Sequence, residues 1–89
     1  MNIRIDPHTL ERAEERGTNE GEIRDVIETG VPIPVKGRRV GKAKVYSFNR
    51  VRRGRLYEHK RVEVIYVQDG NDIVTVTAYV FYGRWEQPA

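Results

Sequence analysis

A change of residue pattern near position 31 constrains the fold of this chain more than any other feature. Residues 1–30 carry helix start and stop signals, whereas residues 31–89 carry β-type runs separated by glycine-containing turns. Pro32 and Pro34 exclude a helix just after the boundary, because proline lacks the backbone N–H that a residue inside a helix donates. The sequence therefore predicts an α+β domain with its helices first and its strands after them.

Two helices are predicted before the boundary. Asp6 is placed to cap the first helix, and Pro7 occupies its first position, where the missing N–H costs nothing. This helix is expected to end at Arg16, because Gly17 can take the left-handed conformation that stops a helix. Its apolar side is narrow and consists of Leu10 and Ala13.

The second helix is expected to follow a cap at Thr18 or Asn19 and to end at Gly30. Its apolar side consists of Ile23, Val26 and Ile27. Neither helix can bury its apolar side alone. We therefore expect the two helices to form a hairpin that packs against a sheet.

Three β-type runs follow the boundary, at residues 42–50, 56–68 and 73–82, with a weaker run at residues 33–40. The Asp-Gly-Asn-Asp cluster at residues 69–72 is a hairpin signal. The prediction is an α+β fold in which two N-terminal helices pack on one face of a three- to four-stranded antiparallel sheet. A chain of 89 residues is long enough for one core, so we expect a single domain that spans residues 1–89.

The loop at residues 69–72 decides which side chains share a face of the sheet. A loop with an odd number of residues places Val62, Val64 and Tyr66 beside Val76, Ala78 and Val80. The opposite face then carries Arg61, Glu63, Thr75, Thr77 and Tyr79. A two-residue loop instead places the first group beside Thr75, Thr77 and Tyr79. We favour the odd loop because it separates polar from apolar side chains more cleanly.

The second face of the sheet remains partly apolar with either loop, because Ile65 and Val67 or their equivalents lie on it. We expect a partner or the C-terminus to cover this apolar surface.

Charge is distributed unevenly along the chain. Residues 1–30 hold four basic and eight acidic residues, a net charge of −4, whereas residues 31–89 hold twelve basic and five acidic residues, a net charge of +7. Eleven of the 26 residues from Lys36 to Arg61 are lysine or arginine, against the single acid Glu58. Tyr46, Phe48, Tyr57 and His59 are interleaved among these cations.

Cations that alternate with aromatic side chains suit a nucleic acid strand, whose phosphates and bases they contact in turn. The alternative is a solvated, basic sheet edge that keeps strands of different molecules apart. We favour RNA and expect it to contact Arg38, Arg39, Lys42, Lys44, Arg52, Arg53, Arg55, Lys60 and Arg84.

Strand alternation also predicts a candidate catalytic row. It places Tyr57, His59, Arg61 and Glu63 on one side of a strand, beside Tyr79 of the neighbouring strand. Metal-free RNA cleavage needs a base for the 2′-hydroxyl, cations for the phosphorane charge and an acid for the leaving oxygen. His59 or Glu63 would be the base, Arg61 the charge stabiliser, and Tyr57 or Tyr79 the acid or a stacking platform. The alternative is a polar network on a solvated sheet face. In a regular strand Lys60 lies on the side opposite to Tyr57, His59, Arg61 and Glu63.

Other residue types narrow the function further. We expect no metal site, because the chain has no cysteine and its two histidines, His8 and His59, are far apart in sequence. We expect no nucleotide cofactor, because Gly37, Gly41 and Gly54 precede strands or turns rather than helices. No apolar run approaches the roughly 18 residues of a membrane span, so we expect a cytoplasmic protein that does not contact a membrane.

Several segments together resemble a known family. They are His8, Glu15-Arg16-Gly17-Thr18, Glu22-Ile23, Val26-Ile27, Gly30, Lys60-Arg61-Val62-Glu63-Val64 and Ile73-Val74-Thr75-Val76. Over residues 5–84 the chain resembles the domain-of-unknown-function family 4258, a branch of the RelE/ParE-like toxin fold close to the BrnT ribonuclease toxins. The resemblance implies a type II toxin-like protein that cleaves RNA and is held inactive by an antitoxin protein from a neighbouring gene. Family members with ribonuclease activity use lysine, arginine and tyrosine side chains of the sheet and C-terminal segment, whereas ParE-like members act on gyrase.

Three hypotheses follow for the function. The first is a metal-independent endoribonuclease that cleaves RNA through the 2′-hydroxyl, free or on the ribosome. The second is a module that binds RNA or the ribosome without catalysis. The third is a protein-interaction domain whose basic strands contact an acidic partner. The partly apolar second sheet face is consistent with a homodimer or with an antitoxin segment that covers it.

Overall fold

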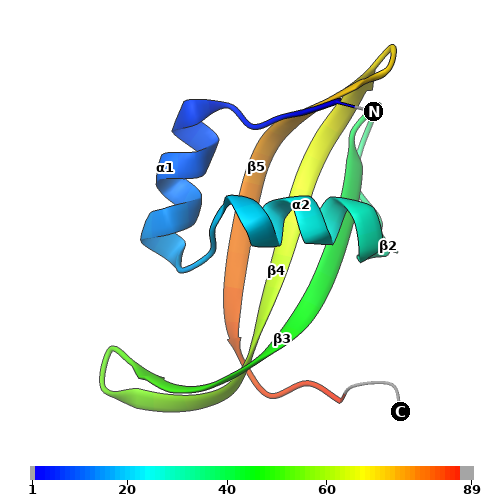
Figure 1. Cartoon of the computed structure of the whole chain (residues 1–89). Helices are drawn as coiled ribbons and strands as arrows, with labels where there is room; N and C mark the ends of the chain where they lie inside the picture. Colours follow the sequence, from blue (N-terminus) through cyan, green and yellow to red (C-terminus); the bar gives the residue numbers. More distant parts are fainter. Residues whose placement is uncertain (1, 87–89) are drawn as a thin grey trace.

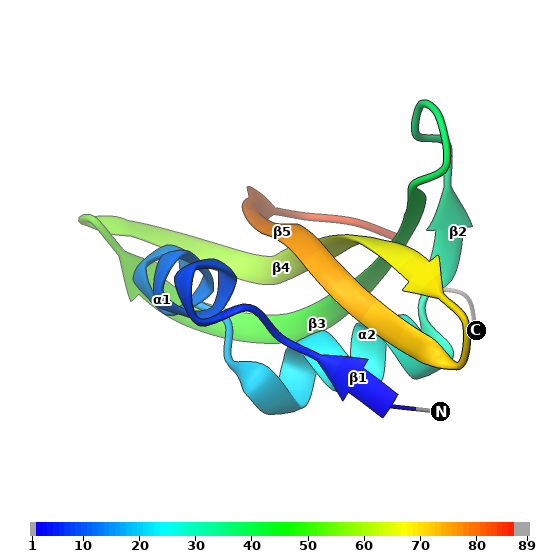
Figure 2. The same cartoon turned by 90° about the horizontal axis from the view of Figure 1, so that it is seen from above.

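The computed structural model describes residues 2–86 of the chain (Figure 1). Its elements are β1 (Asn2–Arg4), α1 (Pro7–Arg16), α2 (Glu20–Thr29), β2 (Val31–Ile33), β3 (Val40–Arg52), β4 (Arg55–Asp69) and β5 (Asp72–Gly83). Both helices lie on one side of the twisted sheet, with α1 along the outer edge of β5 and α2 crossing β4 and β3 (Figures 1 and 2). No helix among residues 2–86 combines the length and apolar content needed to cross a membrane.

The predicted helix ends are confirmed. The Asp6 carboxylate accepts hydrogen bonds from the backbone N–H groups of His8 and Thr9, and Pro7 opens α1. Gly17 ends α1 with a φ of 103°, a conformation that residues with a Cβ rarely adopt. Asn19 rather than Thr18 caps α2, and Gly30 ends α2 in an extended conformation.

The sheet has five strands rather than the predicted three or four, in the order β1-β5-β4-β3-β2. The strand missed by the sequence analysis is β1, which pairs parallel to β5, so the sheet is not purely antiparallel. A three-residue strand is too short to show alternation, and its partner lies about 70 positions further along the chain. The weak run at residues 33–40 becomes the end of β2 and the connection to β3.

The register between β4 and β5 combines the two predicted alternatives. Asp69 pairs with Asp72, so the turn has two residues and the favoured odd loop was wrong. A bulge where Ile65 pairs with Thr77 and Tyr66 with Thr75 leaves Val76 as an extra residue in β5. Beyond the bulge Val62 and Val64 pair with Val80 and Ala78, as the odd loop predicted, whereas Thr75 faces the helices.

The core lies between the helices and one face of the sheet. Its largest fully buried side chains are Ile23, Val26 and Ile27 of α2 and Val62 and Val64 of β4. The three helix residues are those predicted from the apolar stripe. Every buried side-chain nitrogen or oxygen in the described residues has a hydrogen-bond partner.

Side chains of α1 cover part of the β5 edge that β1 leaves unpaired. The Thr9 hydroxyl donates to the carbonyl oxygen of Val76 at 3.3 Å, and Arg16 donates to that of Ala78 at 2.7 Å. Unpaired carbonyl groups on a strand edge can accept hydrogen bonds from a strand of another molecule. The helix therefore protects this edge against pairing with a second chain.

The C-terminal end of α1 is bound by three strands. Its last carbonyl oxygens, on Glu15, Arg16 and Gly17, accept hydrogen bonds from Arg52 of β3 (3.1 Å), Tyr82 of β5 (2.7 Å) and Lys60 of β4 (2.9 Å), respectively. These carbonyls have no partner within the helix, and the helix dipole makes this end partially negative. The two cations and the hydroxyl therefore attach α1 to the sheet at one point.

Gly17→Ala is expected to lower the free energy of unfolding by at least about 2 kcal/mol. A Cβ at this position would overlap the Tyr82 hydroxyl and would also strain the positive φ, which alone costs about 1–2 kcal/mol. Gly37→Ala is the matched control, because Gly37 has a φ of 73° but open space around it. Urea unfolding of both variants separates the overlap from the backbone strain. Equal losses of unfolding free energy in the two variants would show that the overlap with the Tyr82 hydroxyl costs nothing.

Candidate nucleic-acid interface

The hairpin of β3 and β4 extends beyond the rest of the sheet. The last residue of β5, Gly83, pairs with His59, whereas β3 and β4 continue to the Arg52–Arg55 pair. Arg53 and Gly54 form the turn, with φ values of 52° and 80°. The tip bends toward the end of α1 (Figures 1 and 2). Arg50, Arg53 and Arg55 are exposed on this extension.

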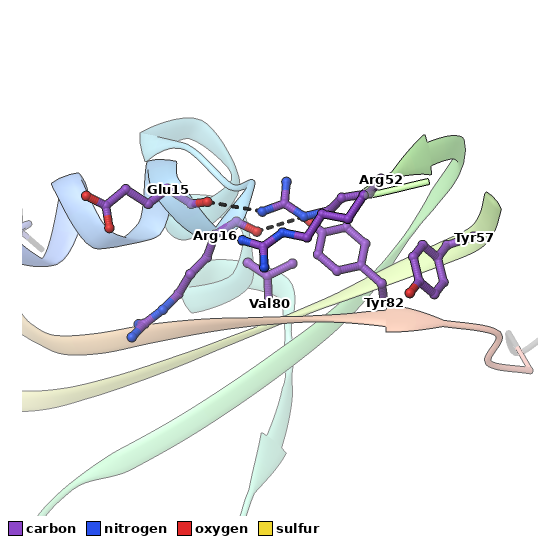
Figure 3. A pocket seen from close by; sticks show the side chains of 7 residues that line it. Glu15, Arg16, Arg52, Tyr57, Val80 and Tyr82 are labelled. Carbon is purple, nitrogen blue, oxygen red and sulfur yellow. Dashed lines mark hydrogen bonds between the residues drawn. The ribbon is translucent and has the colours of Figure 1, made fainter. Parts of the chain in front are cut away.

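A hollow of about 380 Å³ lies between this hairpin and the end of α1. It is lined by Glu15, Arg16, Arg52, Arg53, Tyr57, Val80 and Tyr82. The Arg52 guanidinium lies 4.8 Å from the centre of the Tyr82 ring, and the Tyr57 and Tyr82 rings are 5.6 Å apart (Figure 3). The Glu15 carboxylate points away from Arg52, so arginine and tyrosine side chains dominate the hollow (Figure 3).

Two further hollows continue this surface. A middle hollow of about 460 Å³ shares Tyr57 and Tyr82 with the first and adds Arg55, Leu56, Glu58, Gly83 and Arg84. An end hollow of about 490 Å³ shares Glu58 and Arg84 with the middle one and adds His59, Trp85 and Glu86. We name the three hollows together the hairpin strip. Its lining contains five arginines, three aromatic side chains and the carboxylates of Glu15, Glu58 and Glu86.

The backbone fixes the orientation of His59 in the end hollow. The N–H of Trp85 donates to His59 Nδ1 at 3.1 Å, so a neutral ring carries its proton on Nε2. Beside it Arg84 and Glu58 form an ion pair of 3.3 Å in which both side chains are mostly exposed. Exposed pairs of this kind contribute about 0–1 kcal/mol, so an incoming phosphate can replace the carboxylate at little cost.

Trp85 is positioned by a glycine. Two atoms of its ring lie within 3.5 Å of the place where a Cβ on Gly83 would be. The ring therefore packs against the backbone at the end of β5 and lines the end hollow beside His59. An aromatic ring held in this way can stack on an unpaired base.

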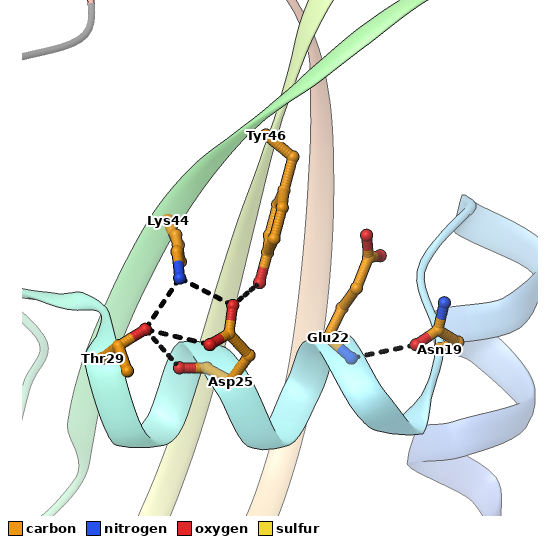
Figure 4. Close-up of polar contacts among 6 residues, drawn as sticks. All are labelled: Asn19, Glu22, Asp25, Thr29, Lys44 and Tyr46. Carbon is orange, nitrogen blue, oxygen red and sulfur yellow. Dashed lines mark hydrogen bonds and ion pairs between the residues drawn. The ribbon is translucent and has the colours of Figure 1, made fainter.

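Several predicted RNA-binding lysines instead contact the acidic helix α2. Lys44 Nζ donates to the Asp25 carboxylate at 2.7 Å, and the Tyr46 hydroxyl donates to the same oxygen at 2.5 Å (Figure 4). Lys42 donates to the carbonyl oxygen of Ile27. Lys60, which is 9% exposed, pairs with Glu22 at 2.8 Å and faces the helices, as strand alternation predicted. These three ammonium groups stabilise the contact between α2 and the sheet.

The other predicted RNA-binding residues fall into two separate groups. Arg52, Arg53, Arg55 and Arg84 lie on the hairpin strip, although Arg52 also binds the end of α1. Arg38 and Arg39 lie before β3, at the opposite end of that strand from the hairpin tip. The basic stretch is therefore not one continuous surface.

The predicted catalytic row is divided in the structure. Arg61 and Glu63 form an ion pair of 3.0 Å, and Glu63 pairs with Tyr79 on the sheet face that the helices leave open. His59 belongs to the end hollow, four residues or about 13 Å of strand from Glu63. Tyr57 contacts Tyr82, which faces the helices, because β3 has a bulge between Ser47 and Arg50 and the hairpin turns as it leaves the sheet. One phosphodiester therefore cannot contact all five side chains.

Sequence reasoning did not predict that Tyr82 and Trp85 line the same surface as the hairpin arginines. Tyr82 and Phe48 have ring centres 5.1 Å apart, and burial raises the pKa of Tyr82, which keeps its hydroxyl as a neutral donor to α1. The detectable signal was the spacing of Tyr82 and Trp85 on either side of Gly83, but their partners depend on how β5 ends.

Within residues 2–86 no three histidine, cysteine or carboxylate side chains come together in a way that could hold a metal ion. No protein-family model matches the chain, no curated protein resembles it closely enough to identify a relative, and no solved structure matches its fold.

Asp25→Asn is expected to flatten the acid dependence of stability. Hydrogen bonds from Lys44, and then from Tyr46, lower the pKa of Asp25 from 3.8 to about 2. A carboxylate with a lowered folded-state pKa contributes stability above its unfolded pKa, and the protein loses that contribution as the pH falls from about 4 to about 2.

The measurement is the urea midpoint at several pH values between 5 and 2. Glu28→Gln is the control, because it removes an exposed carboxylate from the same helix. If the Asp25→Asn variant keeps the full pH dependence of the parent, the pairing with Lys44 does not contribute to acid stability.

Proposed function

We propose that this protein is a toxin-like, metal-independent endoribonuclease that binds a single RNA strand along the hairpin strip. The observation that carries the proposal is the continuity of the strip: three adjoining hollows bring together five arginines and the aromatic side chains of Tyr57, Tyr82 and Trp85, alongside the carboxylates of Glu15, Glu58 and Glu86. Arginines neutralise phosphates and aromatic rings stack on bases, which is the common way to hold a flexible strand without reading its sequence. The resemblance to ribonuclease toxins supports the same function.

The end hollow provides groups suitable for cleavage. Glu58 would take the proton of a ribose 2′-hydroxyl, whose oxygen forms a bond to the adjacent phosphorus. Arg84, released from Glu58 by the phosphate, would stabilise the phosphorane charge. The bond from phosphorus to the 5′-oxygen breaks, and His59 in its imidazolium form gives its Nε2 proton to that oxygen and becomes neutral. The products are a 2′,3′-cyclic phosphate and a 5′-hydroxyl.

The same proposal assigns the protein to the cytoplasm, where RNA and ribosomes are present. It also implies an antitoxin protein that holds the ribonuclease inactive until cleavage is needed. Both statements rest on the resemblance.

A second candidate is RNA or ribosome binding without cleavage. The observation that favours it is the division of the catalytic row: Arg61 and Glu63 pair with each other, and His59 lies about 13 Å of strand from Glu63. If the end hollow does not support proton transfer, the arginines of the hairpin strip still bind RNA.

His59→Ala is expected to slow RNA cleavage by about 10²–10⁴-fold, the usual contribution of one general acid. The assay is end-group analysis of RNA incubated with the purified protein in EDTA, with and without ribosomes. Cyclic-phosphate ends in the parent reaction are the expected product. His8→Ala is the matched control, because it removes the other histidine, whose ring lies exposed on α1 and contacts Arg12.

Two results would contradict parts of this proposal. Full cleavage by the His59→Ala variant would remove the end hollow from the reaction. Intact RNA with the parent protein, together with salt-sensitive binding, would select the second candidate.

Arg53→Gln together with Arg55→Gln is expected to weaken RNA binding by a similar factor for different RNA sequences. Phosphate contacts carry little sequence information, and each one lost reduces the dependence of affinity on salt. Arg38→Gln with Arg39→Gln is the control of equal charge at the other end of β3. Fluorescence anisotropy with single-stranded RNA at several salt concentrations gives both quantities. Equal losses in the two double variants would show that RNA is not confined to the hairpin strip.

A further inference from the structure

We infer that the sheet face opposite the helices binds a peptide segment that carries an aliphatic side chain next to carboxylates. The site is a groove between the sheet and the connection from β2 to β3, which we name the open-face groove. It is formed by Ile33, Val35, Ala43, Val45, Ile65 and Tyr79. This inference does not depend on the proposed ribonuclease activity.

The shape of the groove depends on Gly41. A Cβ on Gly41 would lie within 3.2 Å of Ile33, Val35 and Ile65, so these three side chains meet above a residue that has none. Residues 33–35 therefore form one apolar wall against the sheet, and the hollow beside them has a volume of about 430 Å³. A second hollow of about 420 Å³ shares Ile33 and continues the groove past Ala43 and Val45.

Apolar surface is exposed around the groove. Tyr79 is 41% exposed and Phe81 is 46% exposed, on the same face of β5 with ring centres 6.3 Å apart. At the other side of the groove Val31 is 69% exposed. Apolar side chains gathered in this way on a sheet face commonly mark a protein interaction site.

The charges at the groove define the occupant. Lys36 and Arg39 line the hollow beside residues 33–35, and neither forms an ion pair with any residue in the described part of the chain. Arg61 and Glu63 neutralise each other on the groove floor, and the carboxylate of Glu86 lies at the far hollow, away from Lys36 and Arg39. The unbalanced charge at this end of the groove is therefore positive, and it complements carboxylates that flank an apolar anchor.

Aliphatic walls distinguish this site from the hairpin strip. Ile33, Val35 and Ile65 surround the hollow, with Tyr79 as its single aromatic side chain. A nucleic acid strand needs rings on which its bases stack. An isoleucine, leucine or valine side chain matches this hollow better, so an acidic peptide is the occupant that the chemistry favours.

The test starts with selection of peptides from a random 12-residue display library on the immobilised full-length protein. The selected peptide with the highest affinity is then labelled and measured by fluorescence anisotropy. We expect it to contain aliphatic residues next to aspartate or glutamate. Lys36→Glu with Arg39→Glu should weaken its binding at least tenfold, whereas the control Arg53→Glu with Arg55→Glu should change it less than twofold. All four side chains are exposed, and thermal unfolding verifies that both variants stay folded.

Four results would overturn the inference. The first is a set of selected peptides without acidic and aliphatic residues. The second is a peptide that loses affinity for the hairpin control variant and keeps it for the variant with Lys36→Glu and Arg39→Glu. Single-stranded RNA as the probe would lose more affinity with the groove variant than with the hairpin variant, which would identify RNA as the occupant. Light scattering would show a dimer that the groove variant dissociates, which would identify a second copy of this chain.

Discussion

The attachment of α1 to the sheet is the interaction on which the rest of the structure depends. A helix of ten residues cannot stay folded alone, and its C-terminal carbonyls need donors. Arg52, Lys60 and Tyr82, from three different strands, provide those donors at one point. Hydrogen bonds that involve a charged donor contribute more than neutral ones, about 1.5–3 kcal/mol each. The same contacts hold the long hairpin beside α1 and so create the first hollow of the hairpin strip.

The separation of charge along the sequence is partly an internal feature of the fold. Acids of α2 meet lysines of β3 and β4, with Tyr46 between Lys44 and Lys60 at 5.6 and 5.9 Å from its ring centre. Cations that contact α2 contribute to the helix–sheet interface and not to a surface that could bind a polyanion. Arg52, Arg53 and Arg55 of the hairpin tip form no ion pair within residues 2–86, and this difference leaves them available to the RNA that we propose to bind there.

The two faces of the sheet differ in what covers them. The face toward the helices is occupied by the core, and α1 also covers part of the β5 edge through Thr9 and Arg16. The opposite face retains exposed apolar side chains and two cations, Lys36 and Arg39. The proposed RNA on the hairpin strip and the inferred peptide beside Lys36 and Arg39 would contact different residues, although the end hollow of the strip and the far hollow of the groove meet at Glu86.

The sequence by itself determined the helices, their caps and the positions of the three long strands, because these depend on local signals such as Asp6, Pro7 and Gly17. It also identified which stretch is basic and that Lys60 faces away from its neighbours in the strand. Only the tertiary structure decided the rest. The strand β1 and the bulge at Val76 arise from pairing between distant segments, and the hairpin bend moves Tyr57 away from His59. Which cations are exposed was likewise decided by the packing of α2, because its carboxylates and a carbonyl oxygen bind Lys44, Lys60 and Lys42 and so withdraw these ammonium groups from the surface.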